Sequence, residues 1–185
     1  MRILPIDELN GLEAKLTPYF NEQGHIKNDD ACEDIIDELL DLYLLALANG
    51  VNSVNEQFNT DIQPSDDDVY EIIYYQIDGM TFEDRVRAWY EADGTIEDIV
   101  RIAETESHRI GNTAAFNTAV KAGATQKTWL TMLDDRVRDT HEYLEAVSVE
   151  INSDFYTFDG DHAPAPGMFQ NVANNANCRC ELAFS

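Results

Sequence analysis

Apolar residues recur at helical spacing in the first half of the chain. Ile35, Leu39 and Leu42 lie three or four positions apart, and acidic residues crowd the turn before them. Gly50 follows the last apolar position, where a glycine commonly ends a helix. This pattern predicts a helix over residues 29–49 that stops at Gly50.

Three further helix starts are marked by a hydroxyl residue followed by acidic residues. Ser65, Thr81 and Thr95 each precede Asp or Glu in the next turn, as expected for a helix N-cap. The helix from Thr95 is predicted to run as far as Ala122, with Gly111 bending or dividing it.

After Gly123 the helical spacing gives way to alternation. Residues 127–133, 146–151 and 178–184 alternate between two faces, which predicts short strands. Residues 159–167 hold two glycines and two prolines and are predicted to form a loop. Helices first and strands later indicate an α+β fold, with a helical N-terminal half and a small, mostly antiparallel β-containing C-terminal half.

Charge separates the two halves. The net charge is −24, and the first 100 residues carry 5 basic and 24 acidic residues, whereas the rest carry 7 and 12. We expect an acidic helical segment over residues 1–94 and a second domain over 95–185, both compatible with one compact unit. The acidic surface either keeps the protein soluble or meets a basic partner.

The composition also excludes several classes of protein. An excess of acidic residues disfavours direct binding to nucleic-acid phosphates and to anionic membranes. The N-terminus lacks the apolar run of a signal peptide, and no stretch is apolar and long enough to span a bilayer. Three cysteines do not form a disulfide framework, so we expect a soluble protein of a reducing compartment.

Four clusters of polar and aromatic residues stand out between residues 95 and 184. In chain order they are Glu104-Thr105-Glu106 followed by Asn112, then Lys127-x-Trp129, then the run from Asp134 through Arg136 and Arg138 to His141, and finally Asn177-Cys178-Arg179-Cys180. With a loop containing Pro164, Pro166 and Gly167, this ordered set resembles the phage Mu F-like head morphogenesis domain. One departure is Glu104, where that family often has an arginine, so a salt bridge from that position is in doubt.

The run from Asp134 to His141 allows three interpretations. The favoured one is structural, with Arg136 or Arg138 forking onto Asp134 or helix acids and His141 satisfying backbone groups. In a catalytic interpretation His141 is a general base oriented by Asp134, although the sequence places no Ser or Cys as nucleophile. The third is binding of a partner's carboxylates or phosphates. Trp129, in an alternating strand, is expected to anchor the core.

Cys178, Cys180 and His141 could also be metal ligands, with His162 as a fourth. Zinc sites usually separate paired cysteines by two to four residues, whereas these are separated by one. We therefore favour two small buried side chains that share a face with Leu182 and Phe184, and predict no metal and no cofactor. The intervening Arg179 is expected to point the other way and pair with an acid.

The resemblance implies a minor structural protein of a tailed phage or prophage that acts in head morphogenesis. Its expected partners are the portal protein and the major capsid or scaffold protein. It would then lie in the virion, in the head interior or near the portal, and in the host cytoplasm during assembly. The charge alone supports an alternative, an acidic DNA mimic that occupies a host DNA-binding protein. Mu F-like domains are sometimes joined to toxin domains, but the chain ends soon after Cys180, so we expect no enzyme.

Overall fold

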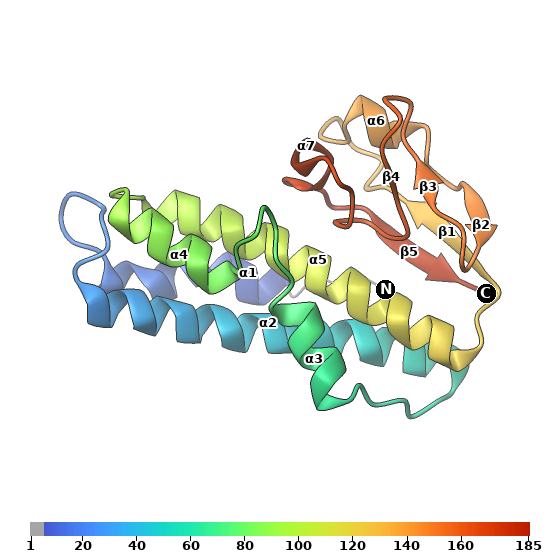
Figure 1. Ribbon diagram of the computed structural model, residues 1–185, viewed down its shortest axis with the longest axis horizontal. Coiled ribbons are helices and arrows are strands. Elements are labelled where there is room, and N and C mark those ends of the chain that lie inside the picture. The colour runs from blue at the N-terminus through green and yellow to red at the C-terminus, as the bar shows by residue number, and fades with distance from the viewer. Residues whose placement is uncertain (1–5) are drawn as a thin grey trace.

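The computed structural model describes the backbone of residues 6–185 and the side chains of residues 11–185. Five helices form a layer in the first two thirds of the chain: α1 (Ile6–Leu16), α2 (Asp29–Phe58), α3 (Asp66–Ile73), α4 (Phe82–Glu91) and α5 (Ile96–Ala122). The rest, residues 123–185, is called the C-terminal module here. It contains β1 (Gln126–Leu130), α6 (Asp139–Glu142), β2 (Ser148–Glu150), β3 (Phe155–Tyr156), β4 (His162–Ala163), α7 (Val172–Asn175) and β5 (Glu181–Phe184). The module sits beside one end of the helical layer (Figure 1).

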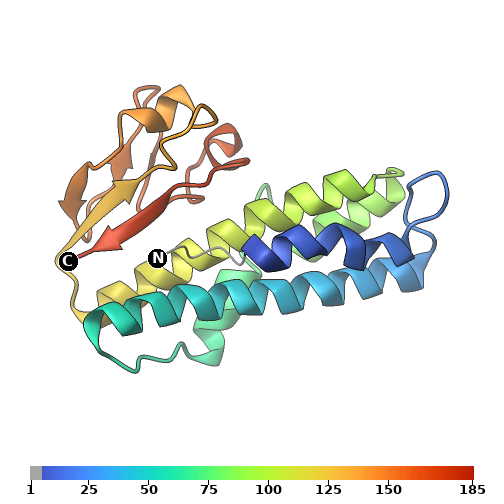
Figure 2. The same cartoon turned by 180° about the vertical axis from the view of Figure 1, so that it is seen from behind.

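The long helices α2 and α5 run side by side and form the axis of the molecule (Figures 1 and 2). The prediction that α2 stops at Gly50 is wrong, because α2 continues to Phe58 and Asn59 ends it with a left-handed φ of 51°. The division of the helix from Thr95 at Gly111, one of the two predicted outcomes there, is also wrong, since α5 is one continuous helix. A Cβ on Gly50 would lie 2.2 Å from the carbonyl oxygen of Gly111. Gly50 therefore allows α2 to pack closely against α5, which the local sequence cannot reveal.

The predicted helix starts at Ser65, Thr81 and Thr95 are confirmed. Each is the N-cap of its helix, and the Asp three residues further on accepts a hydrogen bond from the cap residue's backbone N–H. In α3 and α4 the cap hydroxyl accepts the reciprocal bond from the N–H of that Asp. The three caps are capping boxes. A capping box involves residues only three positions apart, so it can be predicted from the sequence.

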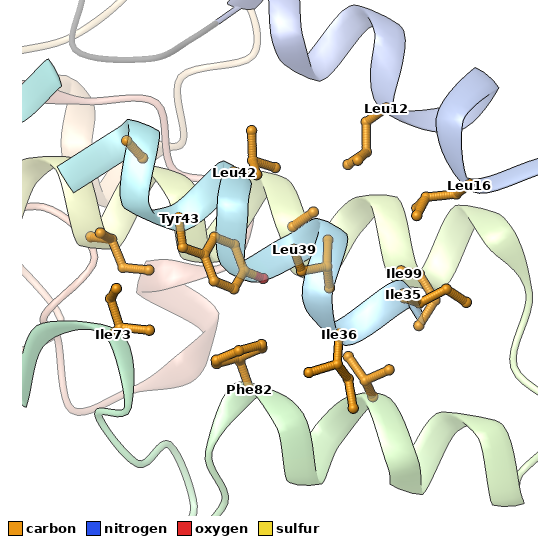
Figure 3. Packing of buried hydrophobic residues seen from close by; sticks show 14 of the residues in the cluster. Leu12, Leu16, Ile35, Ile36, Leu39, Leu42, Tyr43, Ile73, Phe82 and Ile99 are labelled. Carbon is orange, nitrogen blue, oxygen red and sulfur yellow. The ribbon is translucent and has the colours of Figure 1, made fainter. Parts of the chain in front are cut away.

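The core of the helical layer is aliphatic with a small aromatic centre. Leu39 and Tyr43 of α2 face Phe82 of α4, and the rings of Tyr43 and Phe82 meet edge to face with centroids 5.0 Å apart (Figure 3). Leu12 and Leu16 of α1 cover the same core from the other side of α2. Helix α1 has no counterpart among the elements predicted from the sequence.

The C-terminal module confirms the α+β class. Its main sheet has the order β2–β1–β5 with both pairs antiparallel, and β3 pairs with β4 in a second, two-stranded sheet. The first strand is shorter than predicted, since β1 ends at Leu130, which still pairs with Glu181, and Leu133 beyond it adopts a left-handed φ of 53°. The predicted loop 159–167 is wrong in part, since it contributes His162 and Ala163 to β4.

Candidate functional site

Helix α5 presents a row of buried polar side chains, and the first of them is Glu106. Its carboxylate is fully buried between two guanidinium groups, with Oε2 2.8 Å from Nη2 of Arg109 and Oε1 3.0 Å from Nη2 of Arg85. Arg109 also donates to the carbonyl oxygen of Ile72 at the end of α3, 2.9 Å away. A buried carboxylate needs such opposite charges, because burial of an unpaired ion is costly. The cluster ties α3, α4 and α5 together.

The structure shows that Glu104, which stands where the Mu F-like family often has an arginine, takes no part in this ion cluster. Glu104 is exposed and Thr105 is only half-buried, while the partners of Glu106 are Arg85 and Arg109. Neither arginine was predicted as a partner from the sequence. Arg109 could have been found from its i, i+3 spacing to Glu106, but Arg85 is 21 positions away on α4 and carries no such signal.

Asn112 joins α5 to the segment that leads into β5. Its Nδ2 atom donates to the backbone carbonyl of Cys180 at 3.2 Å and to that of His108 at 3.1 Å, and it lies 3.0 Å from Nε2 of His108. Burial lowers the pKa of His108, which favours the neutral ring in this network. Asn112 thus holds the C-terminal module against the helical layer.

Lys127 and Trp129 of β1 both point into the C-terminal module. Lys127 is fully buried and donates from Nζ to the carbonyl oxygen of Pro164 at 2.7 Å, with Nζ 4.4 Å from the ring centroid of Phe116. Burial lowers the pKa of Lys127 to about 8. Trp129 is fully buried, as expected for a core anchor, and its ring meets that of Phe155 with centroids 5.1 Å apart.

Asp134 pairs with Arg179 rather than with its neighbours in sequence. The guanidinium of Arg179 donates to both carboxylate oxygens, at 2.8 and 2.6 Å, and lowers the pKa of Asp134. This confirms that Arg179 meets an acid. The expected forks from Arg136 or Arg138 to Asp134 are wrong, because Arg136 offers only its backbone N–H and Arg138 donates to the carbonyls of Ala173 and Ala176.

His141 is buried beside the two cysteines instead of meeting backbone groups as expected. Its Nδ1 atom lies 3.6 Å from the Sγ atoms of both Cys178 and Cys180. The structure does not support the His141–Asp134 dyad, since Nδ1 faces the thiols and the carboxylate faces Arg179. The expected burial of Cys178 and Cys180 is confirmed, and the hydrogen bond between their thiols lowers the pKa of Cys178.

The potential fourth metal ligand, His162, lies outside this cluster. It is half-exposed, and its Nδ1 atom is 2.7 Å from a carboxylate oxygen of Asp154. Among the described residues, the group that could share a metal ion consists of His141, Cys178 and Cys180. The structure thus buries part of the motif set, whereas Asp134 and Arg136 are exposed and Thr105, Arg138 and Arg179 are partly buried; the buried members are Glu106, Asn112, Trp129, His141, Cys178 and Cys180.

Two known proteins are similar to part of this chain. No family model and no solved structure matches the chain, and no described helix is apolar enough over a sufficient length to cross a membrane. The chain is 33% identical over 85 residues to the minor head protein GP7 of Bacillus phage SPP1, which covers 44% of this chain and 28% of that protein. It is 31% identical over 94 residues to the NAD(+)–arginine ADP-ribosyltransferase EFV of Enterococcus faecalis, covering 49% of this chain and 19% of that protein. The chain thus spans less than a third of the length of these curated relatives. The similarity to a minor head protein supports a structural role in a phage head.

Proposed function

We propose that this chain is a minor structural protein of a tailed phage or prophage, with a Mu F-like domain that acts in head morphogenesis in association with the portal or the procapsid interior. The observation that carries the proposal is the similarity to the minor head protein of phage SPP1. The burial of the motif residues agrees with it. Glu106, Asn112 and His141 are at most 1% exposed, so they build the fold and offer little surface to a substrate.

The proposal treats the chain as a non-enzymatic protein. The transferase activity in the name of the second relative is not carried over, because the chain covers only 19% of that protein. The polar groups of the motif are engaged with one another, as the ion cluster of Glu106 and the Asn112 contacts illustrate. Buried polar networks of this kind are typical of fold specification.

The outer face of α2 is the proposed contact with the head. Four exposed aspartates, here called the acidic stripe, recur at spacings of four, three and four residues and therefore share one helix face: Asp30, Asp34, Asp37 and Asp41. Aligned carboxylates of this kind attract a basic surface and steer its approach. We propose that the stripe docks on a basic surface of the portal, capsid or scaffold protein.

Affinity purification from cells in which the phage is assembling, followed by mass spectrometry, tests both the partner and the surface. The stripe variant carries Asp34→Lys, Asp37→Lys and Asp41→Lys. The matched control reverses three exposed acids of the C-terminal module, with Asp135→Lys, Glu142→Lys and Glu150→Lys. We expect portal or capsid protein with the wild type and the control, and a large loss with the stripe variant.

The same experiment separates the alternative function. A DNA mimic would also use the acidic stripe, but it would recover a host DNA-binding protein and no phage structural protein. That result would overturn the head-morphogenesis proposal. Equal recovery of head proteins by all three forms would leave the head role standing and refute the acidic stripe as its docking surface.

A further inference from the structure

Three buried side chains of the C-terminal module have the spacing of a zinc site. The Nδ1 atom of His141 lies 3.6 Å from each of the Sγ atoms of Cys178 and Cys180, and the three atoms are all within 4.8 Å of one another. Zinc held tetrahedrally at about 2.1 Å from nitrogen and about 2.3 Å from sulfur sets a nitrogen–sulfur edge of about 3.6 Å. The observed distances match that edge on both sides.

The backbone explains how cysteines one residue apart can act together. Cys178 and Cys180 lie in the segment that leads into β5, and alternate residues of an extended chain point to the same side. Arg179 between them points away, toward Asp134. Both sulfur atoms thus reach the same nitrogen of His141, so a separation of one residue does not prevent the two cysteines from sharing a metal ion.

The histidine is held in place by packing. The ring of His141 meets the rings of Trp129 and Phe169 with centroids 5.3 and 5.2 Å apart. Its Nε2 atom has no hydrogen-bond partner among the described residues, so these rings fix the orientation that a second hydrogen bond usually sets in metal-bound histidines. Nδ1 is thereby left directed at the thiols.

A fourth ligand has room next to the cluster. A pocket of about 10 Å³ is lined by the three side chains together with Arg136, Arg138 and other residues. That volume is close to what one water molecule needs. A site with three protein ligands and one water is a common arrangement for zinc.

We propose that His141, Cys178 and Cys180 bind Zn²⁺ through Nδ1 and two thiolates, with a water in the adjoining pocket as the fourth ligand. The two thiolates balance the charge of the ion, and binding releases their protons. The ion joins α6 to the segment before β5 across 37 and 39 residues of sequence. A soft sulfur and imidazole set in tetrahedral geometry favours zinc over magnesium, calcium or manganese.

The test measures zinc and free thiols in the full chain purified without chelator. Cys178→Ser and Cys180→Ser remove ligands, and Cys32→Ser is the matched control because Cys32 is a buried cysteine of α2, in the other core. We expect equimolar zinc in the wild type and in the control, and at least a tenfold loss in the two ligand variants. Removal of zinc by a chelator should lower the melting temperature of the wild type and leave the ligand variants unchanged.

Cobalt titration of the metal-free wild type keeps the proposal testable if the ligand variants fail to fold. We expect tetrahedral Co²⁺ absorption bands with a thiolate charge-transfer band, and their displacement by zinc. A wild type whose three cysteines are all free thiols, with no bound zinc and no cobalt bands, would overturn the proposal. So would a Cys178–Cys180 disulfide in protein purified under reducing conditions, or loss of zinc in Cys32→Ser alone.

Discussion

The helical layer and the C-terminal module bury different kinds of groups, although both rest on α2 and α5. The helical core consists mainly of aliphatic side chains such as Ile35 and Leu39, and the ion cluster of Glu106 is the buried charged group of this layer. The C-terminal core surrounds Trp129 and includes a fully buried lysine, Lys127, and the cluster of His141 with two cysteines. Aliphatic burial is tolerant of exchange, whereas buried polar groups need specific partners. The motif residues are therefore concentrated where the fold depends on individual contacts.

A substitution at the contact between α2 and α5 should destabilise both regions at once, because both pack against this helix pair. In Gly50→Ala the new Cβ would lie 2.2 Å from the carbonyl oxygen of Gly111, which is backbone and cannot rotate away. We expect the free energy of unfolding to fall by about 3 to 5 kcal/mol. Chemical denaturation followed by far-UV circular dichroism and by Trp fluorescence should show both regions affected.

A matched control is Gly11→Ala in α1, where a Cβ would meet nothing within 4 Å. Alanine is the better helix former, so this change should stabilise the protein by about 0.5 to 1 kcal/mol. If Gly50→Ala is as stable as the wild type, α2 and α5 do not pack as closely as described.

The buried ion cluster should respond more strongly than its exposed neighbour. Glu106→Gln keeps the shape of the side chain but leaves Arg85 and Arg109 without their counter-charge, which should cost about 3 kcal/mol. Glu104→Gln changes an exposed charge two residues away and should stay within about 0.5 kcal/mol of the wild type. Urea denaturation of both variants decides this, and equal losses would contradict the assignment of Glu106 as the buried partner.

Features that depend on neighbouring residues could be predicted from the sequence, whereas features that depend on contacts between distant residues could not. The caps at Ser65, Thr81 and Thr95 were predicted because a capping box is complete within four residues. Gly50 was misinterpreted because its function depends on Gly111 of another helix. In the candidate site, several motif residues such as Glu106 and His141 are buried, but which residues they contact depends on the fold.

Arg179 illustrates the point about partners. It takes Asp134, which lies 45 positions earlier, although Arg136 and Arg138 are much closer to Asp134 in sequence. The fold of the segment before β5 likewise places both Sγ atoms, of Cys178 and Cys180, beside His141, which their spacing in sequence does not show. Separation in sequence predicts neither the partner of Arg179 nor the joint placement of the two cysteines. Strand alternation and sheet pairing determine which side chains meet.

Lys127 should give the C-terminal module a distinctive pH dependence. Its pKa is about 8 in the folded protein and about 10.4 in an unfolded chain, so between these values the unfolded state binds more protons. The contribution of Lys127 to stability should therefore rise with pH across this window, by on the order of 3 kcal/mol.

The measurement compares urea denaturation of the wild type and Lys127→Met at several pH values from about 7 to 10. Other groups titrate in both proteins, so the difference between their pH profiles isolates Lys127. We expect the stability of the wild type to rise relative to that of the variant as pH increases. Parallel profiles would show that Lys127 keeps an ordinary pKa and that its ammonium is solvated.

The pair of Asp134 and Arg179 should show the smallest effect, because both side chains are partly exposed and solvent screens their attraction. Asp134→Asn should shift the urea midpoint only slightly at neutral pH. The pKa of Asp134 is lowered by Arg179, so its stabilisation is present at neutral pH and is lost as pH falls through that lowered value. The difference between wild type and variant should therefore vanish in acid. A loss as large as that of Glu106→Gln would mean that this pair, and not the buried groups, holds the segment before β5 in place.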